Sequence, residues 1–136
     1  MAKTIFDKIL SGDLPSETVY ENKQVLAFLD IAPVAEGHTL VIHKKDRSAE
    51  LSKMKKRAST QLMHAVQDVM KLLKDKLGAT GINVLLAEGS DAGQEVMHAH
   101  VHLIPRYKDD GLHLHNVAAK AASEESLQSL AKQLRD

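Results

Sequence analysis

The spacing of apolar side chains along the 136 residues predicts three helices with strands between them. Residues 57–77 carry apolar side chains three and four positions apart, which predicts a long helix with one buried face, and Gly78 is expected to end it. The stretch TIFDKILSGDLP predicts a short helix capped by Thr4, with Asp7 three residues further on. A stripe of leucines in SEESLQSLAKQLRD predicts a helix at the end of the sequence.

The segments between these helices have the pattern of strands. ETVYENKQVLAFLD predicts a hairpin that turns at Asn22 and Lys23, and residues 38–43, 81–89 and 95–105 predict three further strands. Strands that follow one another with few crossovers favour antiparallel pairing. We therefore expect an α+β fold with about five antiparallel strands, formed by residues 1–136 as a single domain.

Composition excludes several classes of function. The 18 Lys and Arg residues balance the 18 Asp and Glu residues, whereas a protein that binds the phosphates of nucleic acid has an excess of basic residues. No apolar run is long enough for a membrane span, and the N-terminal residues lack the apolar core of a signal peptide, so the cytoplasm is the expected location. The sequence contains no cysteine, which excludes disulfides, thiolate catalysis and cysteine-ligated zinc.

Three histidines alternate with apolar residues in EVMHAHVHLIPR, residues 95–106. On a strand, His98, His100 and His102 share one face, because successive side chains point to opposite sides. A lone histidine on such a face is most often a structural residue. Three imidazoles in register instead indicate a chemical role.

Two kinds of chemistry suit this run. In a metal site, neighbouring histidines about 6.6 Å apart could share an ion, but the outer pair is about 13 Å apart and Zn–N bonds are about 2.0–2.1 Å. Further ligands would have to come from elsewhere, such as His38, His113 or His115. In phosphate chemistry, one imidazole would attack phosphorus and its neighbours would supply protons and hydrogen bonds.

The run HAHVHLI resembles the histidine-triad motif, three histidines separated by apolar residues. The adjoining GSDAGQEVM and PR, and the upstream VLAFLDIAPVAEGHTLVIHKK and TIFDKILSGDLPS, resemble the bacterial and Hint-like members of the histidine triad (HIT) superfamily. The resemblance spans most of the chain. It implies a HIT-like fold, a homodimer in which two sheets join, and catalysis without a cofactor or an obligatory metal.

The activity that this resemblance implies is nucleotide hydrolysis or nucleotidyl transfer at an α-phosphate. A purine nucleoside phosphoramidate is the expected substrate, with AMP or GMP as the product. Hydrolysis of a dinucleoside polyphosphate is the alternative within the same chemistry. A different class of function is also open, namely a protein that binds nucleotide with weak turnover.

Each histidine of the run takes a role from this resemblance. His100 would attack the α-phosphorus to form a nucleotidyl-imidazole, which water then hydrolyses. His102 would bind the phosphoryl oxygens. His98 would orient the run, with its backbone carbonyl facing the His100 ring, and His38 would be the fourth histidine of the active site.

The resemblance also implies substrate-binding residues. Gly93 and Gln94 would form a turn that brings backbone donors towards the phosphate, and Asp30 would accept both ribose hydroxyls. The base pocket would be walled by apolar side chains from the first helix and the second strand, namely Ile5, Phe6, Ile9, Phe28 and Ile31. Plain core packing is the alternative for this apolar group.

The sequence departs from the resembled pattern near the leaving group. Ala87 replaces an Asn or Gln that helps to place the phosphate or the leaving group, and the neighbouring Glu88 is one candidate to compensate. Glu95 replaces a hydroxyl residue of Hint-like members. Two interpretations of Glu95 stay open, protonation of a leaving amine and plain exposure to solvent.

A second departure concerns metal. Thr4, Asp7 and Asp46 stand where many members hold a structural zinc with two cysteines and a histidine, so the resemblance implies that this zinc is missing here. His43 stands where proline is common, a substitution that the sequence does not explain. His64 is expected to be a solvated helix residue.

Overall fold

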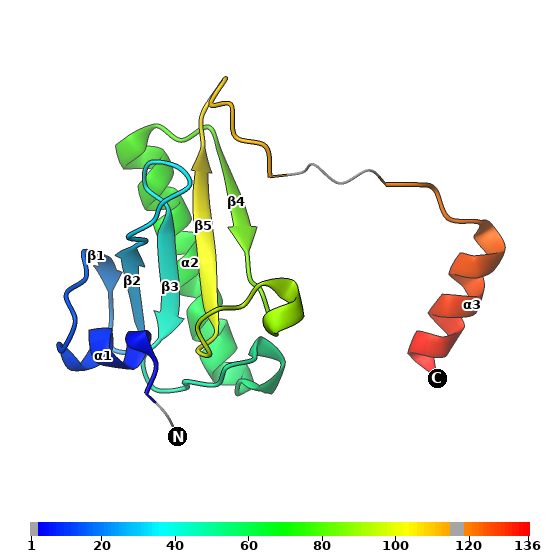
Figure 1. Cartoon of the computed structure of the whole chain (residues 1–136), viewed down its shortest axis with the longest axis horizontal. Helices are drawn as coiled ribbons and strands as arrows, with labels where there is room; N and C mark the ends of the chain where they lie inside the picture. The colour runs from blue at the N-terminus through cyan, green and yellow to red at the C-terminus, as the bar shows by residue number, and fades with distance from the viewer. Residues whose placement is uncertain (1–2, 115–118) are drawn as a thin grey trace.

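The computed structural model describes residues 3–114 and 119–136, which contain three α-helices and a sheet of five antiparallel strands. This α+β architecture confirms the expected fold class. The elements in chain order are α1 (Ile5–Ser11), β1 (Thr18–Glu21), β2 (Val25–Leu29), β3 (Thr39–His43), α2 (Lys56–Leu77), β4 (Gly81–Leu85), β5 (His100–Arg106) and α3 (Glu124–Arg135). The strands lie side by side in the order β1-β2-β3-β5-β4 (Figure 1).

The long helix α2 covers one face of the sheet (Figure 1). Its buried side chains pack against the side chains of β2, β3 and β5 that point to this face, including Val41, Val101 and Leu103. Gly78 ends the helix in the left-handed conformation that the sequence led us to expect, at φ 70°. Because Val101 and Leu103 face α2, the side chains of His100 and His102 point to the opposite face.

The opposite face carries a second, smaller core under α1. Phe6 of α1 packs there with Phe28 of β2 and with Ile42 of β3. The predicted capping box is present, since the Thr4 hydroxyl accepts from the Asp7 N–H and the Asp7 carboxylate accepts from the Thr4 N–H at 2.8 Å. This cap fixes where α1 begins and therefore where Phe6 meets the sheet.

The last strand begins later than its hydrophobic pattern predicts. We expected a strand over residues 95–105, whereas β5 runs from His100 to Arg106. Before His100 the chain leaves the sheet, because the Ala99 N–H donates to the Ser48 carbonyl at 2.8 Å. His98 consequently lies just outside the strand, yet its ring still contacts Phe6 on the α1 side of the sheet.

The helix α3 lies apart from the sheet in Figure 1. Leu127, Leu130 and Leu134 of its predicted apolar stripe are all exposed. In the described ranges, no helix combines the length and the apolar character needed to cross a membrane.

Candidate active site

His100 is held in a single tautomer by the backbone of the same run. Its Nδ1 lies 2.8 Å from the carbonyl oxygen of His98. A carbonyl oxygen only accepts, so Nδ1 carries the proton and the lone pair of the neutral ring is on Nε2. The edge of the Phe6 ring packs against the buried His100 ring, with centroids 5.0 Å apart and planes at 85°. His100 is therefore a fixed imidazole with a nucleophilic nitrogen.

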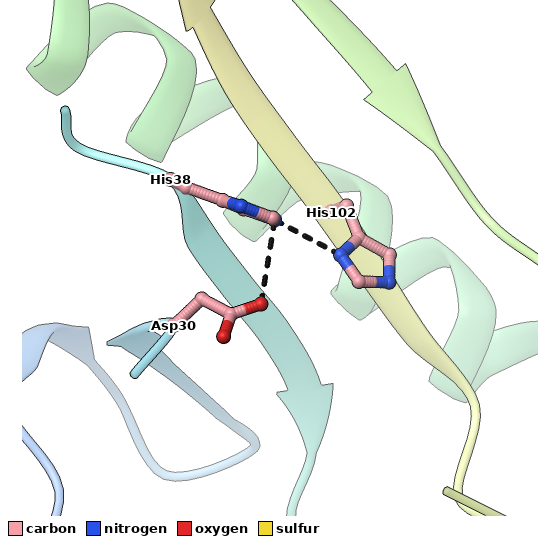
Figure 2. Close-up of side chains that lie close together, drawn as sticks. All are labelled: Asp30, His38 and His102. Carbon is pink, nitrogen blue, oxygen red and sulfur yellow. Dashed lines mark hydrogen bonds and ion pairs between the residues drawn. The ribbon is translucent and has the colours of Figure 1, made fainter. Parts of the chain in front are cut away.

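His102 is oriented by His38, which comes from the loop before β3 (Figure 2). The Val34 N–H donates to His38 Nδ1 at 3.2 Å, so the proton of a neutral His38 is on Nε2. His38 Nε2 lies 3.0 Å from His102 Nδ1 and 3.5 Å from an Asp30 carboxylate oxygen. Donation from His38 makes His102 Nδ1 an acceptor, and His102 then carries its own proton on Nε2.

Burial favours the uncharged forms of His38 and His102. Desolvation is the main cause that lowers the pKa of His102 to about 4, and the neighbouring His100 and His38 rings lower it further. Desolvation also lowers the pKa of His38, against the opposing effect of Asp30. Neutral rings preserve the tautomers that the hydrogen bonds define.

His98 connects the run to a buried histidine that the sequence left unexplained. Its Nε2 donates to the His43 carbonyl at 3.0 Å. The His43 ring points to the α2 side, where its Nε2 donates to Gln61 Oε1 at 2.8 Å and its Nδ1 accepts from the Lys45 and Asp46 N–H groups. His43 thus ties the end of β3 to α2, a role that needs both ring nitrogens and that proline cannot fill.

The structure divides the predicted base-pocket residues into two groups. Phe6 and Phe28 are buried in the smaller core with ring centroids 5.5 Å apart, and Ile9 packs beside them. Ile31 is 96% exposed in the loop after β2, and Ile5 is 50% exposed on α1. Side chains of the second group are free to contact a ligand, whereas those of the first group already pack against each other.

Asp30 follows the last residue of β2 and precedes the exposed Ile31. One of its carboxylate oxygens accepts from the Ala32 N–H at 2.9 Å, and the other faces His38. The carboxylate is partly exposed and belongs to the same polar cluster as His102 (Figure 2). The structure thus brings together Asp30, His38, His100 and His102.

The loop before the histidine run is shaped by Gln94. The Gln94 carboxamide is buried, accepting from the Gly89 N–H at 2.8 Å and donating to the carbonyls of Ala49 and Val96. The N–H groups of Gly93 and Gln94 also donate within the loop, to the Ser90 and Gly89 carbonyls. In this structure these groups build the turn, and the Glu95 side chain after it is exposed.

Glu88 does not compensate for the missing amide at position 87. Its two carboxylate oxygens accept hydrogen bonds from Ser52, one from the backbone N–H at 3.0 Å and the other from the hydroxyl at 2.7 Å. The Ser52 N–H is the main cause that lowers the pKa of Glu88. Position 87 therefore offers only a half-buried methyl group, and Glu88 holds a neighbouring loop.

Among the described residues, Asp30, His38 and His102 alone form a group of three or more His, Asp or Glu with ligand atoms within 4.8 Å of each other. That set does not fit a resident ion, because His38 Nε2 carries a proton while Nδ1 accepts from Val34.

The residues at the zinc positions of the resembled pattern are engaged with other partners. Asp7 binds Arg47 at 2.8 Å, and Asp46 accepts from the Ser48 hydroxyl and the Lys55 N–H. Thr4 caps α1. A hydroxyl and two hydrogen-bonded carboxylates do not fit a structural zinc, which prefers thiolate and imidazole ligands.

The remaining predicted histidines lie away from this cluster. His64 is exposed on α2, as expected, and His113 is exposed in the loop after β5. His115 lies outside the described residues.

Comparison with known proteins places the chain in a family. The HIT domain model matches residues 11–109, so the chain belongs to the HIT family. It is 45% identical over 108 residues to Protein hit of Bacillus subtilis, covering 79% of this chain and 74% of that protein. It is also similar to the adenylylsulfatase HINT1 of Arabidopsis thaliana, with 39% identity that covers 74% of this chain and 69% of that protein.

A solved structure agrees with this assignment. The histidine triad nucleotide-binding protein from Candida albicans superposes with a TM-score of 0.85 at 34% identity, covering 98% of this chain and 95% of that chain. The family and the fold of this chain are therefore those that the histidine run indicated.

Proposed function

We propose that this protein hydrolyses a purine nucleoside phosphoramidate at its α-phosphate through a covalent nucleotidyl-His100 intermediate. The observation that carries the proposal is the hydrogen bond from His100 Nδ1 to the His98 carbonyl. That bond places a proton on Nδ1, so the free lone pair of the buried imidazole is on Nε2. A lone pair held in one direction is what an attack on phosphorus requires.

The first step of the proposed reaction is nucleotidyl transfer to the enzyme. His100 Nε2 forms a bond to the α-phosphorus, the bond from phosphorus to the leaving nitrogen breaks, and the leaving amine takes up a proton. The His102 Nε2–H would donate to a phosphoryl oxygen as charge builds up on it. Glu95 is exposed beside the run and is our candidate donor of the proton to the amine.

Water completes the reaction in the second step. It attacks the phosphorus and gives a proton to the Glu95 carboxylate, the bond to His100 Nε2 breaks, and the nucleoside monophosphate leaves with the imidazole restored. His98 and His38 act as positioning residues, because they fix the tautomers of His100 and His102.

Asp30, Ile5 and Ile31 are our candidates for the nucleoside contacts. Asp30 would accept the ribose hydroxyls through its partly exposed carboxylate, and the two exposed isoleucines would cover the purine. Phe6, Phe28 and Ile9 would support this surface from beneath. Gly93 and Gln94 would set the shape of the phosphate-binding loop.

We further propose that the protein acts as a homodimer joined through β4. This strand is an edge of the sheet, and its Val84 and Leu85 side chains are exposed. An edge strand with exposed apolar side chains is suited to pairing with another chain. A second copy would extend the sheet through the same strand.

One observation favours a second function, nucleotide binding with weak turnover. Ala87 has no amide, and the Glu88 carboxylate already accepts two hydrogen bonds from Ser52, so neither side chain helps to place a leaving group. The histidines and Asp30 would still bind a nucleoside monophosphate. Turnover would then be slow on every substrate.

The deciding experiment measures nucleoside monophosphate release from adenosine 5′-phosphoramidate and from a diadenosine polyphosphate. Wild type and His100→Ala are compared, each with and without a chelator. We expect chelator-resistant release that falls by at least about 10³-fold in the variant. Faster release from the polyphosphate would select the alternative substrate, binding without release would select the second function, and loss of release with chelator would contradict the mechanism.

A further inference from the structure

The segment from Asp30 to His38 joins β2 to β3 and carries a member of the polar cluster at each end (Figure 2). Its base is closed by the Asp30 N–H, which donates to the His38 carbonyl at 2.9 Å. Inside the segment, the Val34 N–H donates to His38 Nδ1 at 3.2 Å. The tautomer of His38, and through it that of His102, therefore depends on the backbone around Val34.

Val34 and His38 are brought together by the turn between them. The His38 N–H donates to the Ala35 carbonyl at 3.1 Å, and Gly37, in the third position of this turn, has φ 89°. Glu36, in the second position, does not have a positive φ. A positive φ confined to the third position defines a type II turn.

Tyr107 holds the central peptide of this turn in its type II orientation. Type I and type II turns differ by a rotation of about half a turn of the peptide between the second and third residues, and this peptide contains the Glu36 carbonyl. The Tyr107 hydroxyl donates to that carbonyl at 3.0 Å. Rotation of the peptide would break this hydrogen bond, so the hydroxyl stabilises the turn as it stands.

Close packing of Gly37 holds the same turn in place. A Cβ atom on Gly37 would lie 2.5 Å from Leu77 Cδ1 and 3.2 Å from Pro105 Cγ, so the backbone passes directly over the end of α2 and over β5. Pro105 lies two residues before Tyr107 in the chain. The turn is therefore attached to the end of β5 by two contacts, the packing of Gly37 and the hydrogen bond from Tyr107.

Tyr107 is itself held firmly at the end of β5. Its N–H donates to an Asp110 carboxylate oxygen at 3.1 Å, and its carbonyl accepts from the Asp110 N–H at 3.2 Å. The same carboxylate accepts from two nitrogens of the Arg106 guanidinium, at 2.9 Å and 3.0 Å. The hydroxyl is thus anchored to the strand that carries His100 and His102.

We propose that Tyr107 is a positioning residue that acts on the tautomer of His38 through this turn. Without the hydroxyl, the peptide after Glu36 rotates more easily, and the Val34 N–H no longer points steadily at His38 Nδ1. The proton of His38 is then shared between its two nitrogens, and part of the His102 population presents an unprotonated Nε2. The effect on turnover rests on the proposed function, whereas the effect on His38 does not.

The ring nitrogens of His38 test this proposal in the full chain without nucleotide. Protonated and unprotonated imidazole nitrogens have well-separated signals in ¹⁵N NMR, so the two tautomers are distinguished directly. In Tyr107→Phe, which keeps the ring and removes the hydroxyl, we expect the Nδ1 and Nε2 signals of His38 to move towards each other. Hydrogen exchange of the Val34 amide should become about three- to tenfold faster, the effect of one lost hydrogen bond.

Tyr20→Phe is the matched control. Tyr20 is the other tyrosine of the chain, and its hydroxyl also donates one hydrogen bond, to Asp68 at 2.8 Å. That bond joins β1, at an edge of the sheet, to α2. The control variant should leave the ring signals of His38 and the exchange of the Val34 amide unchanged.

Kinetics with adenosine 5′-phosphoramidate test the route from Tyr107 to turnover. Tyr107→Phe should lower kcat about three- to tenfold. KM should change less than about twofold, because Asp30 keeps its own hydrogen bonds. In a His38→Ala background the same substitution should change kcat less than about twofold, since its effect passes through His38.

Three results would overturn the proposal. These are unchanged His38 ring signals in Tyr107→Phe, an equal change of those signals in Tyr20→Phe, and a loss of kcat that persists in full in the His38→Ala background. The ring signals need no substrate. A wild type without turnover would therefore contradict the proposed hydrolysis, and the ring signals would still decide whether Tyr107 positions His38.

Discussion

His38 Nε2 lies 3.0 Å from His102 Nδ1, and this contact determines which nitrogen of His102 carries its proton. A backbone N–H from Val34 holds the other nitrogen of His38, so the direction of donation along the pair is fixed. In the proposed reaction, His38 would therefore act through the orientation and tautomer of the neighbouring His102 ring.

Replacing His38 should therefore slow turnover while leaving His100 in place. For His38→Ala we expect kcat to fall about 10- to 100-fold, because His102 loses the partner that fixes its tautomer. His38→Gln, whose amide is able to donate to His102, should recover part of this loss. Steady-state kinetics with equal amounts of folded protein check both values. An unchanged kcat in His38→Ala would show that the tautomer of His102 does not depend on His38.

Stability should fall when the pH is lowered from about 6.5 towards 4. In the folded chain, burial lowers the pKa values of His102, His98 and His38 below the unfolded value of 6.5, and that of His102 reaches about 4. In this window the unfolded chain binds more protons, so the free energy of unfolding is greatest above pH 6.5 and decreases with acid. Denaturant unfolding at pH 7.5, 6 and 5 measures the slope. A free energy of unfolding that is flat over this range would mean that these rings protonate as readily folded as unfolded.

Variants of Phe6 and Ile31 should distinguish a role in core packing from a role in base binding. Phe6→Ala removes a buried ring that contacts Phe28 and His100, and should cost about 3–5 kcal/mol of stability. Ile31→Ala should change stability by less than about 0.5 kcal/mol, because Ile31 is 96% exposed. If Ile31 contacts the purine, the KM of this variant should nevertheless rise several-fold. Thermal unfolding and KM, measured on both variants, check the contrast, and an unchanged KM in Ile31→Ala would remove this residue from the base pocket.

Much of this architecture follows from local rules that are visible in the sequence. The Thr4–Asp7 capping box, the end of α2 at Gly78 and the two faces of the histidine run depend on near neighbours. The start of β5 did not follow, because it is set by the hydrogen bond between Ala99 and Ser48, distant in sequence. The hydrogen bond from the Ser52 hydroxyl to the Glu88 carboxylate is likewise a tertiary contact that a pattern of residue types does not reveal.

His43 was the residue least predictable from the sequence, and its role is testable. His43→Ala leaves Gln61 and two backbone N–H groups without their partner, and should cost about 2–4 kcal/mol of stability. Gln61→Ala should cost about 1–3 kcal/mol through the unsatisfied Nε2–H. Gln67→Ala is the control, because Gln67 is exposed on the same helix. Chemical denaturation of the three variants measures these differences, and a His43→Ala variant as stable as the control would exclude the bridging role.

Metal removal should leave the stability of this chain unchanged. In place of a metal, the Asp7–Arg47 ion pair and the Asp46 hydrogen bonds hold the segment around α1 and the start of α2. We therefore expect the melting temperature to shift by less than about 1 °C with chelator or with added Zn²⁺, because a ligand stabilises only the folded state that binds it. Arg47→Ala should cost less than about 1 kcal/mol, since Arg47 is 46% exposed and solvent screens the pair. A clear rise in melting temperature with Zn²⁺ would instead show that Thr4, Asp7 and Asp46 rearrange to bind the ion.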